Sequence, residues 1–292
     1  MIPGRFEYHR PASVGEAIAL LQKHGDEGRA LAGGHSLIPM MKLRLAQPSH
    51  LVDLQAIAGL KGIRDTADGI AIGAMTTQAE LLASTVVAAK APILHEAARL
   101  IADPQVRYCG TIGGNVANGD PGNDMPAIMM ALGASFVAQG AKGERVLDPR
   151  HYYQAPFTTA LAEGELLTEI RVPSCPAGHG YAYEKMKRKT GDYATAGAAV
   201  ILEMAGGRCR RAAVALTNLA GTPLFAEAAG NALAGSAVDA AAIERAVAAA
   251  VAATDPASDM RGPPEFRRHV AGVMTRRAIQ RALARATGGA GQ

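Results

Sequence analysis

Two short glycine-containing segments constrain this chain of 292 residues more than any other feature. The first holds Gly33 and Gly34; the second holds Gly113 and Gly114, about eighty residues later, and runs on through Asn, Asp, Gly and Pro to position 124. Each pair lies between an apolar run and hydroxyl or amide side chains. Because glycine lacks a Cβ, such turns let backbone N–H groups converge on an anion and let a ligand approach closely. Two such segments therefore predict a dinucleotide whose pyrophosphate is held from both sides.

The composition limits the alternatives. The chain is 49% hydrophobic and 19% charged, with a mean hydropathy of +0.06, which is typical of a globular protein with a large core in one large domain or two to three smaller ones. The formal net charge is +4 and the pI is about 9.0, but only 185–189 is a dense basic run. Aromatic residues make up 4% and Trp is absent. Nucleic-acid binding usually requires a basic stripe with interleaved aromatics, so the composition argues against that function.

Cysteine use and the N-terminus bear on the cellular compartment. The three cysteines, Cys109, Cys175 and Cys209, are widely spaced and form no CxxC pair, so they predict neither a zinc site nor an iron–sulfur cluster within this chain. We assign no metal ligands and no catalytic residues. Unpaired thiols fit a reducing cytoplasm, where core packing is their default role. We expect a cytoplasmic protein, because the N-terminus lacks signal-peptide features and no apolar stretch reaches membrane-spanning length without charge.

Residues 1–55 predict a small β-α-β unit. Ser13 and Glu16 have the spacing of a capping box, and the apolar residues that follow recur at helical spacing up to about His24. We expect strands over 29–32 and 51–54, and between them a helix over 37–45 that Ser36 can cap. The first glycine pair then lies where a strand meets a helix, a position where backbone donors and the helix dipole favour phosphate.

The rest of the chain predicts further strands and helices. Between 56 and 176 we expect a capping box at Thr77 and Glu80, strands over 60–64, 70–73, 135–139, 144–147 and 166–172, helices over 91–100 and 125–132, and a loop over 102–124. Such a long loop is uncommon unless it is functional. After a linker near 173–176, we expect strands over 180–187, 196–204 and 208–216, helices over 223–233, 238–253 and 264–285, and a frayed tail over 288–292.

Several common signatures are absent. No G-x-G-x-x-G follows a strand, no G-x-x-x-x-G-K-[ST] is present, and Ser36 lies in no G-x-S-x-G elbow. The segment from His95 to Arg99 begins like a zinc-protease helix but has Arg where the second His belongs. The glycine segments therefore belong to neither the usual Rossmann nor the P-loop class.

Residues 32–54 and 111–124 resemble the two FAD-binding motifs of the flavoprotein (medium) subunit of molybdenum hydroxylases, the carbon monoxide dehydrogenase and xanthine dehydrogenase family. The likeness covers essentially the whole chain, including Gly-Asp-Tyr-Ala-Thr-Ala at 191–196, and is greatest toward carbon monoxide dehydrogenase medium subunits. It implies an α+β, vanillyl-alcohol-oxidase-type FAD-binding fold. Two α+β subdomains, 1–55 and 56–176, would clasp an extended FAD, followed by a C-terminal domain over 177–287 with a three-stranded sheet and three helices, and a tail over 288–292.

The resemblance also implies which residues contact FAD, which would be bound non-covalently. The first segment would grip the pyrophosphate through its amides: Ala32, Gly33, Gly34, His35 and Ser36, with Leu37 beside them. The second segment would bind its other side: Thr111, Gly113, Gly114 and Asn115. Asn118 and Asp124 match positions that contact the ribityl and adenosine portions. Leu167 and Lys185 match positions near the adenine and the flavin, and Tyr193 matches one beside the isoalloxazine ring.

The residues themselves leave simpler interpretations open. Gly33 and Gly34 taken alone also suit a tight turn, and His35 can be an ordinary turn residue. Asp124 can be just the N-cap of the helix that follows. Tyr193 is equally an ordinary buried strand aromatic, and the basic run at 185–189 is more often a solvated face.

Two functions follow from these observations. The first is an FAD-carrying electron-transfer subunit of a heteromeric molybdenum hydroxylase. In that family a small subunit with two [2Fe-2S] clusters passes electrons to the flavin, a large subunit holds the molybdenum-pterin cofactor, and an external acceptor takes the electrons. The resemblance implies a dimer of such heterotrimers, cytoplasmic or peripheral on the inner face of the membrane. The alternative is a self-contained flavin oxidase or reductase of the same superfamily. The substrate stays open, because its pocket would lie on another chain.

Overall fold

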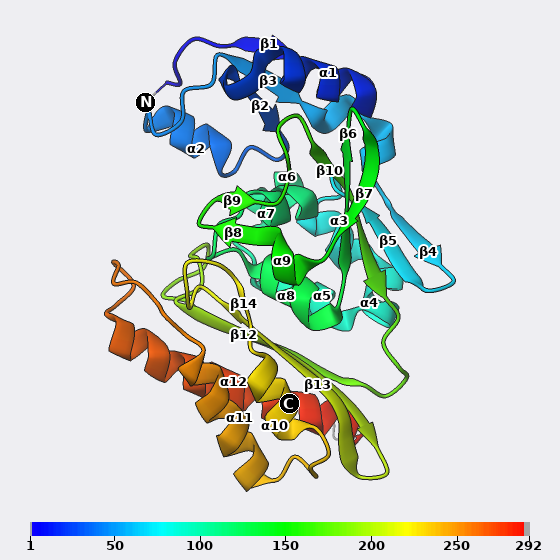
Figure 1. Ribbon diagram of the computed structural model, residues 1–292, viewed down its shortest axis with the longest axis vertical. Helices are drawn as coiled ribbons and strands as arrows, with labels where there is room; N and C mark the ends of the chain where they lie inside the picture. Colours follow the sequence, from blue (N-terminus) through cyan, green and yellow to red (C-terminus); the bar gives the residue numbers. More distant parts are fainter. Residues whose placement is uncertain (1, 289–292) are drawn as a thin grey trace.

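The computed structural model describes residues 2–288, which form three regions along the long axis of the molecule (Figure 1). A three-stranded sheet lies at one end, a five-stranded sheet with most of the short helices lies in the middle, and a four-stranded sheet with three helices lies at the other end. The predicted α+β class is confirmed. The domain boundaries stay predictions, and the predicted frayed tail lies outside the described residues except for Gly288. Among residues 2–288, no helix combines the length and apolar character needed to cross a membrane.

The N-terminal sheet is parallel, with the strand order β1-β3-β2. Its region contains β1 (Glu7–His9), α1 (Val14–His24), the 3-10 helix η1 (Gly25–Glu27), β2 (Gly28–Leu31), α2 (Leu37–Lys42) and β3 (His50–Asp53). The predicted β-α-β unit is confirmed, but β1 was not predicted because this short, exposed edge strand has no apolar pattern. The capping box at α1 is only half formed. Ser13 Oγ accepts the Glu16 N–H at 3.2 Å, whereas the Glu16 carboxylate accepts the N–H of Ala12.

The middle region contains an antiparallel sheet with the strand order β4-β5-β10-β6-β7. Its strands are β4 (Ile63–Thr66), β5 (Gly69–Gly73), β6 (Ser135–Gly140), β7 (Gly143–Leu147) and β10 (Leu166–Pro173), with the small pair β8 (Tyr153–Ala155) and β9 (Thr158–Thr159). Its helices are η2 (Leu54–Ala56), η3 (Ala58–Leu60), α3 (Gln78–Ala83), α4 (Thr85–Lys90), α5 (Pro92–Leu100), α6 (Pro104–Cys109), α7 (Ile112–Ala117), α8 (Asp124–Leu132) and α9 (Pro149–Tyr152). The capping box at Thr77 is fully formed.

The prediction of one long loop over 102–124 is wrong in part, because this segment contains α6 and α7. Asp103 caps α6 by accepting the Val106 N–H, and Pro104 stands in its first turn, where the missing N–H costs nothing. Thr111 caps α7 by accepting the Gly114 N–H. Glycine is a weak helix former, so the two glycines of α7 argued against a helix there, although tertiary contacts hold them in one. The six residues of α6 contain no glycine but are too few to show a helical period.

The C-terminal sheet has four strands rather than the predicted three, in the order β11-β12-β13-β14. Its elements are β11 (Gly180–Met186), β12 (Ala196–Ala205), β13 (Arg208–Thr217), β14 (Leu224–Phe225), α10 (Glu227–Leu233), α11 (Ala240–Ala252) and α12 (Pro264–Ala286). The helix predicted from 223 begins only at Glu227, because Leu224 and Phe225 pair with β13 as the fourth strand. A two-residue strand is too short for any periodicity to reveal it.

Both faces of the C-terminal sheet are buried. Along β12, Ala199 and Ile201 pack toward the middle region, whereas Val200 and Leu202 belong to the hydrophobic core between the sheet and α12. The helices cover the outer face, as Figure 1 shows. Because successive strand residues point to opposite faces, burial on both sides explains why this strand is a continuous apolar run without alternation. The sheet is thereby fixed against the middle region, and Lys185 on β11 and residues 191–193 in the loop before β12 reach the cavity described next.

Candidate functional site

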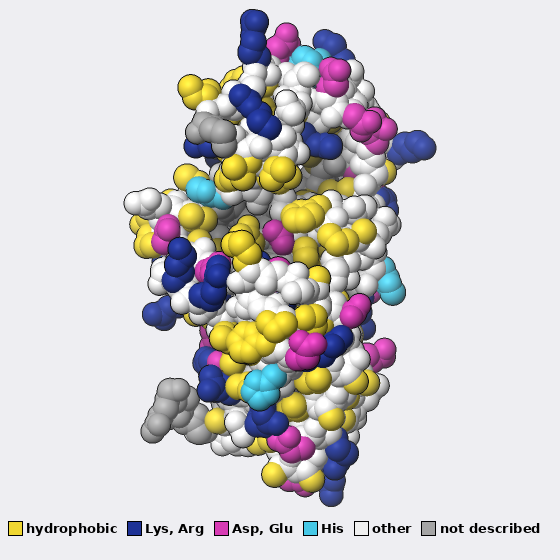
Figure 2. All heavy atoms as spheres, turned by 90° about the vertical axis from the view of Figure 1, so that its left-hand side faces the viewer, with side chains coloured by type: hydrophobic (Ala, Val, Ile, Leu, Met, Phe, Trp, Pro, Cys, Tyr) yellow, Lys and Arg dark blue, Asp and Glu magenta, His cyan; other side chains and the backbone are white. Residues whose placement is uncertain are grey.

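A cavity of about 1030 Å³ lies between the N-terminal and middle regions. Figure 2 shows the surface hollowed between the upper end of the molecule and its middle. The fifteen site residues predicted from the sequence, which come from all three regions, line this cavity: Ala32, Gly33, Gly34, His35, Ser36, Leu37, Thr111, Gly113, Gly114, Asn115, Asn118, Asp124, Leu167, Lys185 and Tyr193. The structure thus brings together residues separated by more than half of the chain, while their contact with FAD stays a prediction.

The first glycine segment offers unpartnered backbone donors. Among the described residues, no acceptor takes the N–H groups of residues 33–37. Gly34 has a φ of 73°, a left-handed conformation that a residue with a Cβ adopts only with strain. Ser36 does not cap α2, because its own backbone is helical (φ −101°, ψ −53°) and its hydroxyl bonds no N–H of that helix. Several N–H groups of one turn are therefore available to an anion in the cavity.

The second glycine segment uses its backbone donors inside the protein. The N–H groups of Ile112, Gly113, Gly114 and Asn115 donate to Thr76 O, Ala74 O, Thr111 Oγ1 and Thr111 O, at 2.9, 2.8, 3.0 and 3.0 Å. A Cβ on Gly113 would lie 2.5 Å from both Ala74 Cβ and Ala74 O. This glycine therefore permits close packing of α7 on the end of β5, and the segment presents its surface, rather than free N–H groups, to the cavity.

The two segments also touch each other. A Cβ on Gly33 would lie 2.2 Å from the carbonyl oxygen of Cys109, at the turn that leads into the second segment. A Cβ on Gly114 would lie 2.8 Å from Thr111 Oγ1 and 3.4 Å from Ala32 Cβ. Glycine at these positions lets the two backbones meet and form one continuous wall of the cavity.

Three buried polar atoms on the cavity wall have no hydrogen-bond partner within the described residues. They are the amide Oε1 and Nε2 of Gln78 and the amide Nδ2 of Asn118. Buried polar groups are normally paired, because an unpaired one costs about 1–3 kcal/mol. Asn118 was predicted as a site residue, but Gln78 was not, since it follows the capping Thr77 in what reads as an ordinary helix start. These atoms indicate a polar ligand in the cavity.

Asp124 and Lys185 form a buried ion pair on the cavity wall. Lys185 Nζ lies 2.8 Å from Asp124 Oδ2, and the two side chains are 1% and 7% exposed. Tyr183, fully buried and missed by sequence reasoning, donates its hydroxyl to Asp124 Oδ1 at 2.5 Å. Burial, and then the Asp124 carboxylate, raise the pKa of Tyr183 well above its usual value. The N-cap of α8 is Asn123 and not Asp124, whose carboxylate instead ties α8 to β11 of the C-terminal sheet.

Asn115, like Asp124, holds parts of the fold together through hydrogen bonds. Its side-chain Oδ1 accepts the N–H of Met125 at 3.1 Å, and its backbone carbonyl accepts Asn123 Nδ2 at 2.7 Å. The Asn/Asp run after the second glycine pair is thus held in place by its own side chains. This explains an ordered structure in a segment whose composition is typical of loops.

Tyr193 lies at the edge of the cavity and is 38% exposed, so it is not an ordinary core aromatic. A Cβ on Gly122 would lie 3.1 Å from Tyr193 Cδ1, so the ring rests on this glycine. Burial raises the pKa of Tyr193, and the Asp120 carboxylate raises it further. Burial also raises the pKa of Asp120. The Tyr193 ring therefore joins the C-terminal region to the second glycine segment.

Parts of the cavity wall are formed by residues that were not predicted as site residues. They come from Arg29 on β2, the segment 45–48, Val106 on α6, Phe157 and the segment 161–165. Phe157 has a φ of 60°, rare for a residue with a large side chain, and its side chain is 58% exposed. These positions lie outside both glycine segments and carry no recognisable pattern, so only the folded chain could place them here.

The donor set fits FAD. Unpartnered N–H groups in the first segment suit the pyrophosphate, unpartnered amide atoms on Gln78 and Asn118 suit hydroxyl or ring polar atoms, and the volume of the cavity suits an extended dinucleotide. His35, Leu167 and Tyr193 complete walls that are partly polar and partly apolar.

Comparison with known proteins agrees with this site. Residues 4–175 match the sequence family described as the FAD binding domain in molybdopterin dehydrogenase, and residues 181–282 match the CO dehydrogenase flavoprotein C-terminal domain. The carbon monoxide dehydrogenase medium chain of Afipia carboxidovorans is 60% identical over 98% of this chain and 99% of its own, and that of Hydrogenophaga pseudoflava is 50% identical over 98% and 99%.

A solved structure agrees with these sequence matches. A chain of the crystal structure of a cyanide-inactivated Cu,Mo-CO dehydrogenase superposes with a TM-score of 0.96 at 60% identity, covering 98% of this chain and 100% of that one. The predicted FAD cofactor and the predicted fold are confirmed. This chain therefore belongs to the family of FAD-binding medium subunits of molybdopterin dehydrogenases.

Proposed function

We propose that this chain is the FAD-carrying electron-transfer subunit of a heteromeric molybdenum hydroxylase. In this role it takes electrons from [2Fe-2S] clusters on a small subunit and passes them to an external acceptor, while a large subunit holds the molybdenum-pterin cofactor and the substrate. The observation that carries the proposal is the single cavity lined by both glycine segments in a chain of this family. FAD supplies the exchange of electrons, and the protein supplies its binding and orientation.

The residues of this chain have distinct tasks in the proposal. The free N–H groups of residues 33–37 hold the pyrophosphate, and Gln78 and Asn118 bond polar atoms of the bound cofactor. The second segment forms the opposite wall. Asp124 and Lys185 lock the C-terminal sheet onto the middle region, and Tyr193 covers the cavity edge. No covalent bond to the flavin is needed, so we propose non-covalent binding.

We further propose that the complex oxidises carbon monoxide. Support comes from the two similar proteins named above, which are both called carbon monoxide dehydrogenase medium chains and match over nearly their full lengths. We also propose a dimer of heterotrimers in the cytoplasm, with peripheral contact to the inner face of the membrane through the complex. The division of the chain at residues 55 and 176 belongs to the same proposal.

Reconstitution tests the electron-transfer function. The purified chain should be yellow, and denaturation should release its FAD into solution. Carbon monoxide should reduce the isolated chain slowly or not at all, because the substrate pocket lies on a partner. The chain assembled with the cluster and molybdenum subunits should pass electrons to a quinone-like or artificial acceptor. Rapid stoichiometric reduction of the isolated chain by a substrate would instead favour a self-contained flavin oxidase or reductase.

A further inference from the structure

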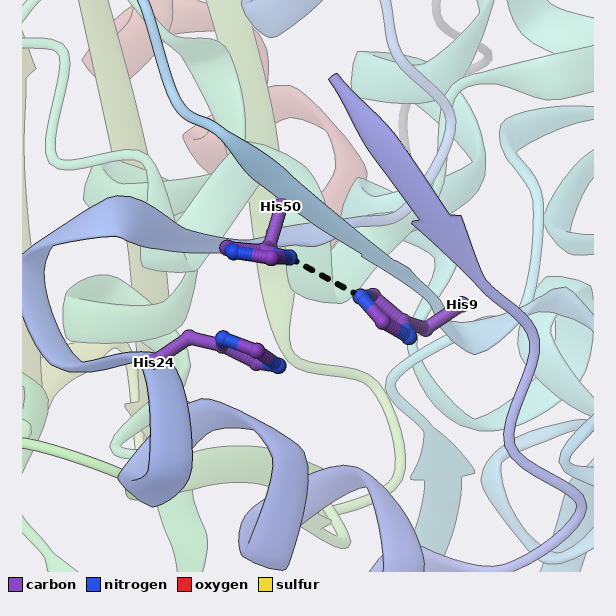
Figure 3. Close-up of side chains that lie close together, drawn as sticks. All are labelled: His9, His24 and His50. Carbon is purple, nitrogen blue, oxygen red and sulfur yellow. Dashed lines mark hydrogen bonds between the residues drawn. The ribbon is translucent and has the colours of Figure 1, made fainter.

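Three histidines converge on the N-terminal sheet, and none of them lines the cavity. His9 ends β1, His24 ends α1 and His50 begins β3, and Figure 3 shows the His24 ring stacked on that of His50 with His9 beside them. They are far apart in sequence, and none stands in a motif with metal-ligand spacing. The parallel pairing of β1 with β3, with α1 packed beside them, brings the three rings together.

The ring nitrogens are close enough to share one ion. His9 Nε2 lies 3.1 Å from His50 Nδ1, and one ligand atom from each of the three rings lies within 4.8 Å of the other two. In a tetrahedral site with Zn–N bonds of about 2.0–2.1 Å, neighbouring nitrogens are roughly 3.3 Å apart. The pair of His9 and His50 already has nearly this separation. His24 must approach by about 1.5 Å or less, by the same geometry.

His24 lacks a partner for one ring nitrogen. Its Nε2 is buried and has no hydrogen-bond partner among the described residues. Its ring stacks on His50, with centroids 3.6 Å apart and planes inclined by 22°, so it must tilt out of this stack to point a lone pair at a shared ion. An ion would satisfy the orphan nitrogen, which the stacked arrangement leaves unpaired.

A carboxylate lies at the edge of the cluster. Glu7 Oε2 is 3.3 Å from His50 Nδ1, and the Glu7 side chain is 74% exposed. A carboxylate or a water can therefore complete a fourth position.

We propose that His9, His24 and His50 form a binding site for one divalent transition-metal ion of the Zn²⁺ or Co²⁺ type, with Glu7 or water as the fourth ligand. Three imidazoles select such ions over Mg²⁺ and Ca²⁺, which prefer oxygen ligands. The ion would tie the paired strands β1 and β3 of the N-terminal sheet to the end of α1. None of its three histidines lines the cavity that we assign to FAD.

Titration of the purified full-length chain, made without a histidine tag and treated with a chelator, tests the site. With CoCl₂ we expect one ion per chain and the intense visible absorption of tetrahedral Co²⁺, and ZnCl₂ should displace it. Zinc should also raise the melting temperature, because it binds the folded chain. Weak binding that does not saturate, or a spectrum without the intense tetrahedral band, would overturn the proposal.

Variants assign the ligands. His24→Ala should weaken zinc binding by more than about 100-fold, since losing even a partner of a ligand costs 10- to 100-fold. Glu7→Gln should have a smaller effect. His151→Gln is the matched control, because His151 is an exposed histidine on α9 away from the cluster, and its binding should equal that of the unchanged chain.

A measurement on the unchanged chain keeps the test decisive if a variant fails to fold. Diethyl pyrocarbonate modifies accessible imidazoles, and mass spectrometry locates the modified residues. Zinc should protect His9, His24 and His50 and leave the exposed His151 and His269 reactive. Equal modification of all these histidines with and without zinc would show that the cluster binds no metal.

Discussion

The two glycine pairs look alike in sequence but differ in what their backbones do. In the first segment, the N–H groups of residues 33–37 have no acceptor among the described residues, whereas in the second segment those of residues 112–115 are all used inside the fold. Gly34 has a left-handed φ, while Gly113 stands in a helix packed against Ala74. A glycine pair can therefore either bind a ligand or allow close packing of the chain. Only the hydrogen bonds of its backbone N–H groups show which of these two roles it has.

The difference assigns binding to one segment and architecture to the other. The second segment leads into Asp124, which holds the C-terminal sheet through Lys185 and Tyr183. Changes in the second segment should therefore affect stability first, and a change at Gly34 of the first pair should affect FAD binding first. The four predictions below test this division.

Asp124→Ala should cause the largest loss of stability. Removing this carboxylate leaves the ammonium of Lys185 buried and unpaired, which typically costs about 3–5 kcal/mol. Chemical denaturation of the FAD-free chain should show this loss. The control is Glu244→Ala, which breaks the exposed pair with Arg276 and should cost about 1 kcal/mol or less. Equal losses of unfolding free energy in the two variants would show that Asp124 does not have this structural role.

Gly113→Ala should cause the next largest loss of stability. The new Cβ would lie 2.5 Å from Ala74, so α7 and β5 must move apart, at a cost of about 1–3 kcal/mol. Gly15→Ala is the matched control. Gly15 lies in α1, and a Cβ added to it would meet no atom within 4 Å, so this change should be neutral or slightly stabilising. Thermal unfolding without FAD compares them, and an unchanged midpoint for Gly113→Ala would contradict close packing at α7.

Gly34→Ala should affect FAD more than stability. Alanine at φ 73° carries strain of about 1–2 kcal/mol, which the loop can relieve by turning its N–H groups away from the cavity. We expect at least a tenfold weaker FAD affinity and a nearly unchanged core by circular dichroism. Flavin fluorescence measures the affinity. Full FAD occupancy in this variant would mean that the first segment does not hold the pyrophosphate.

Gln78→Leu should have the smallest effect. It should leave the stability of the FAD-free chain unchanged or raise it, but it should weaken FAD binding. Without FAD the variant should be as stable as the original chain or more so, because it removes two buried unpartnered atoms. With FAD it should bind about 0.5–1.5 kcal/mol more weakly, through the loss of a hydrogen bond. Gln55→Leu, at an exposed position, should change neither quantity. A loss of stability without FAD would indicate that Gln78 has a structural partner.

Much of the fold could be predicted from sequence because local signals agree with tertiary structure. The predicted helix over 125–132 and the predicted hairpin over 135–147 correspond to α8, β6 and β7. Predictions were wrong where the signal was short or weak: β1, β14 and α6 are too short for periodicity, and the glycines of α7 argued against a helix. The site residues carried in motifs were all brought to the cavity, whereas Gln78 and Tyr183 carry no local mark of their roles.

The sequence by itself determined the glycine pairs, the caps and the apolar periodicity, since these depend on neighbouring residues and on backbone conformation. Tertiary structure alone decided which glycine segment keeps free N–H groups, which carboxylate neutralises Lys185, and that His9, His24 and His50 meet. These outcomes depend on partners far along the chain. Whether a donor is free or a charge is paired depends on what packs against it, and packing exists only once the whole chain has folded.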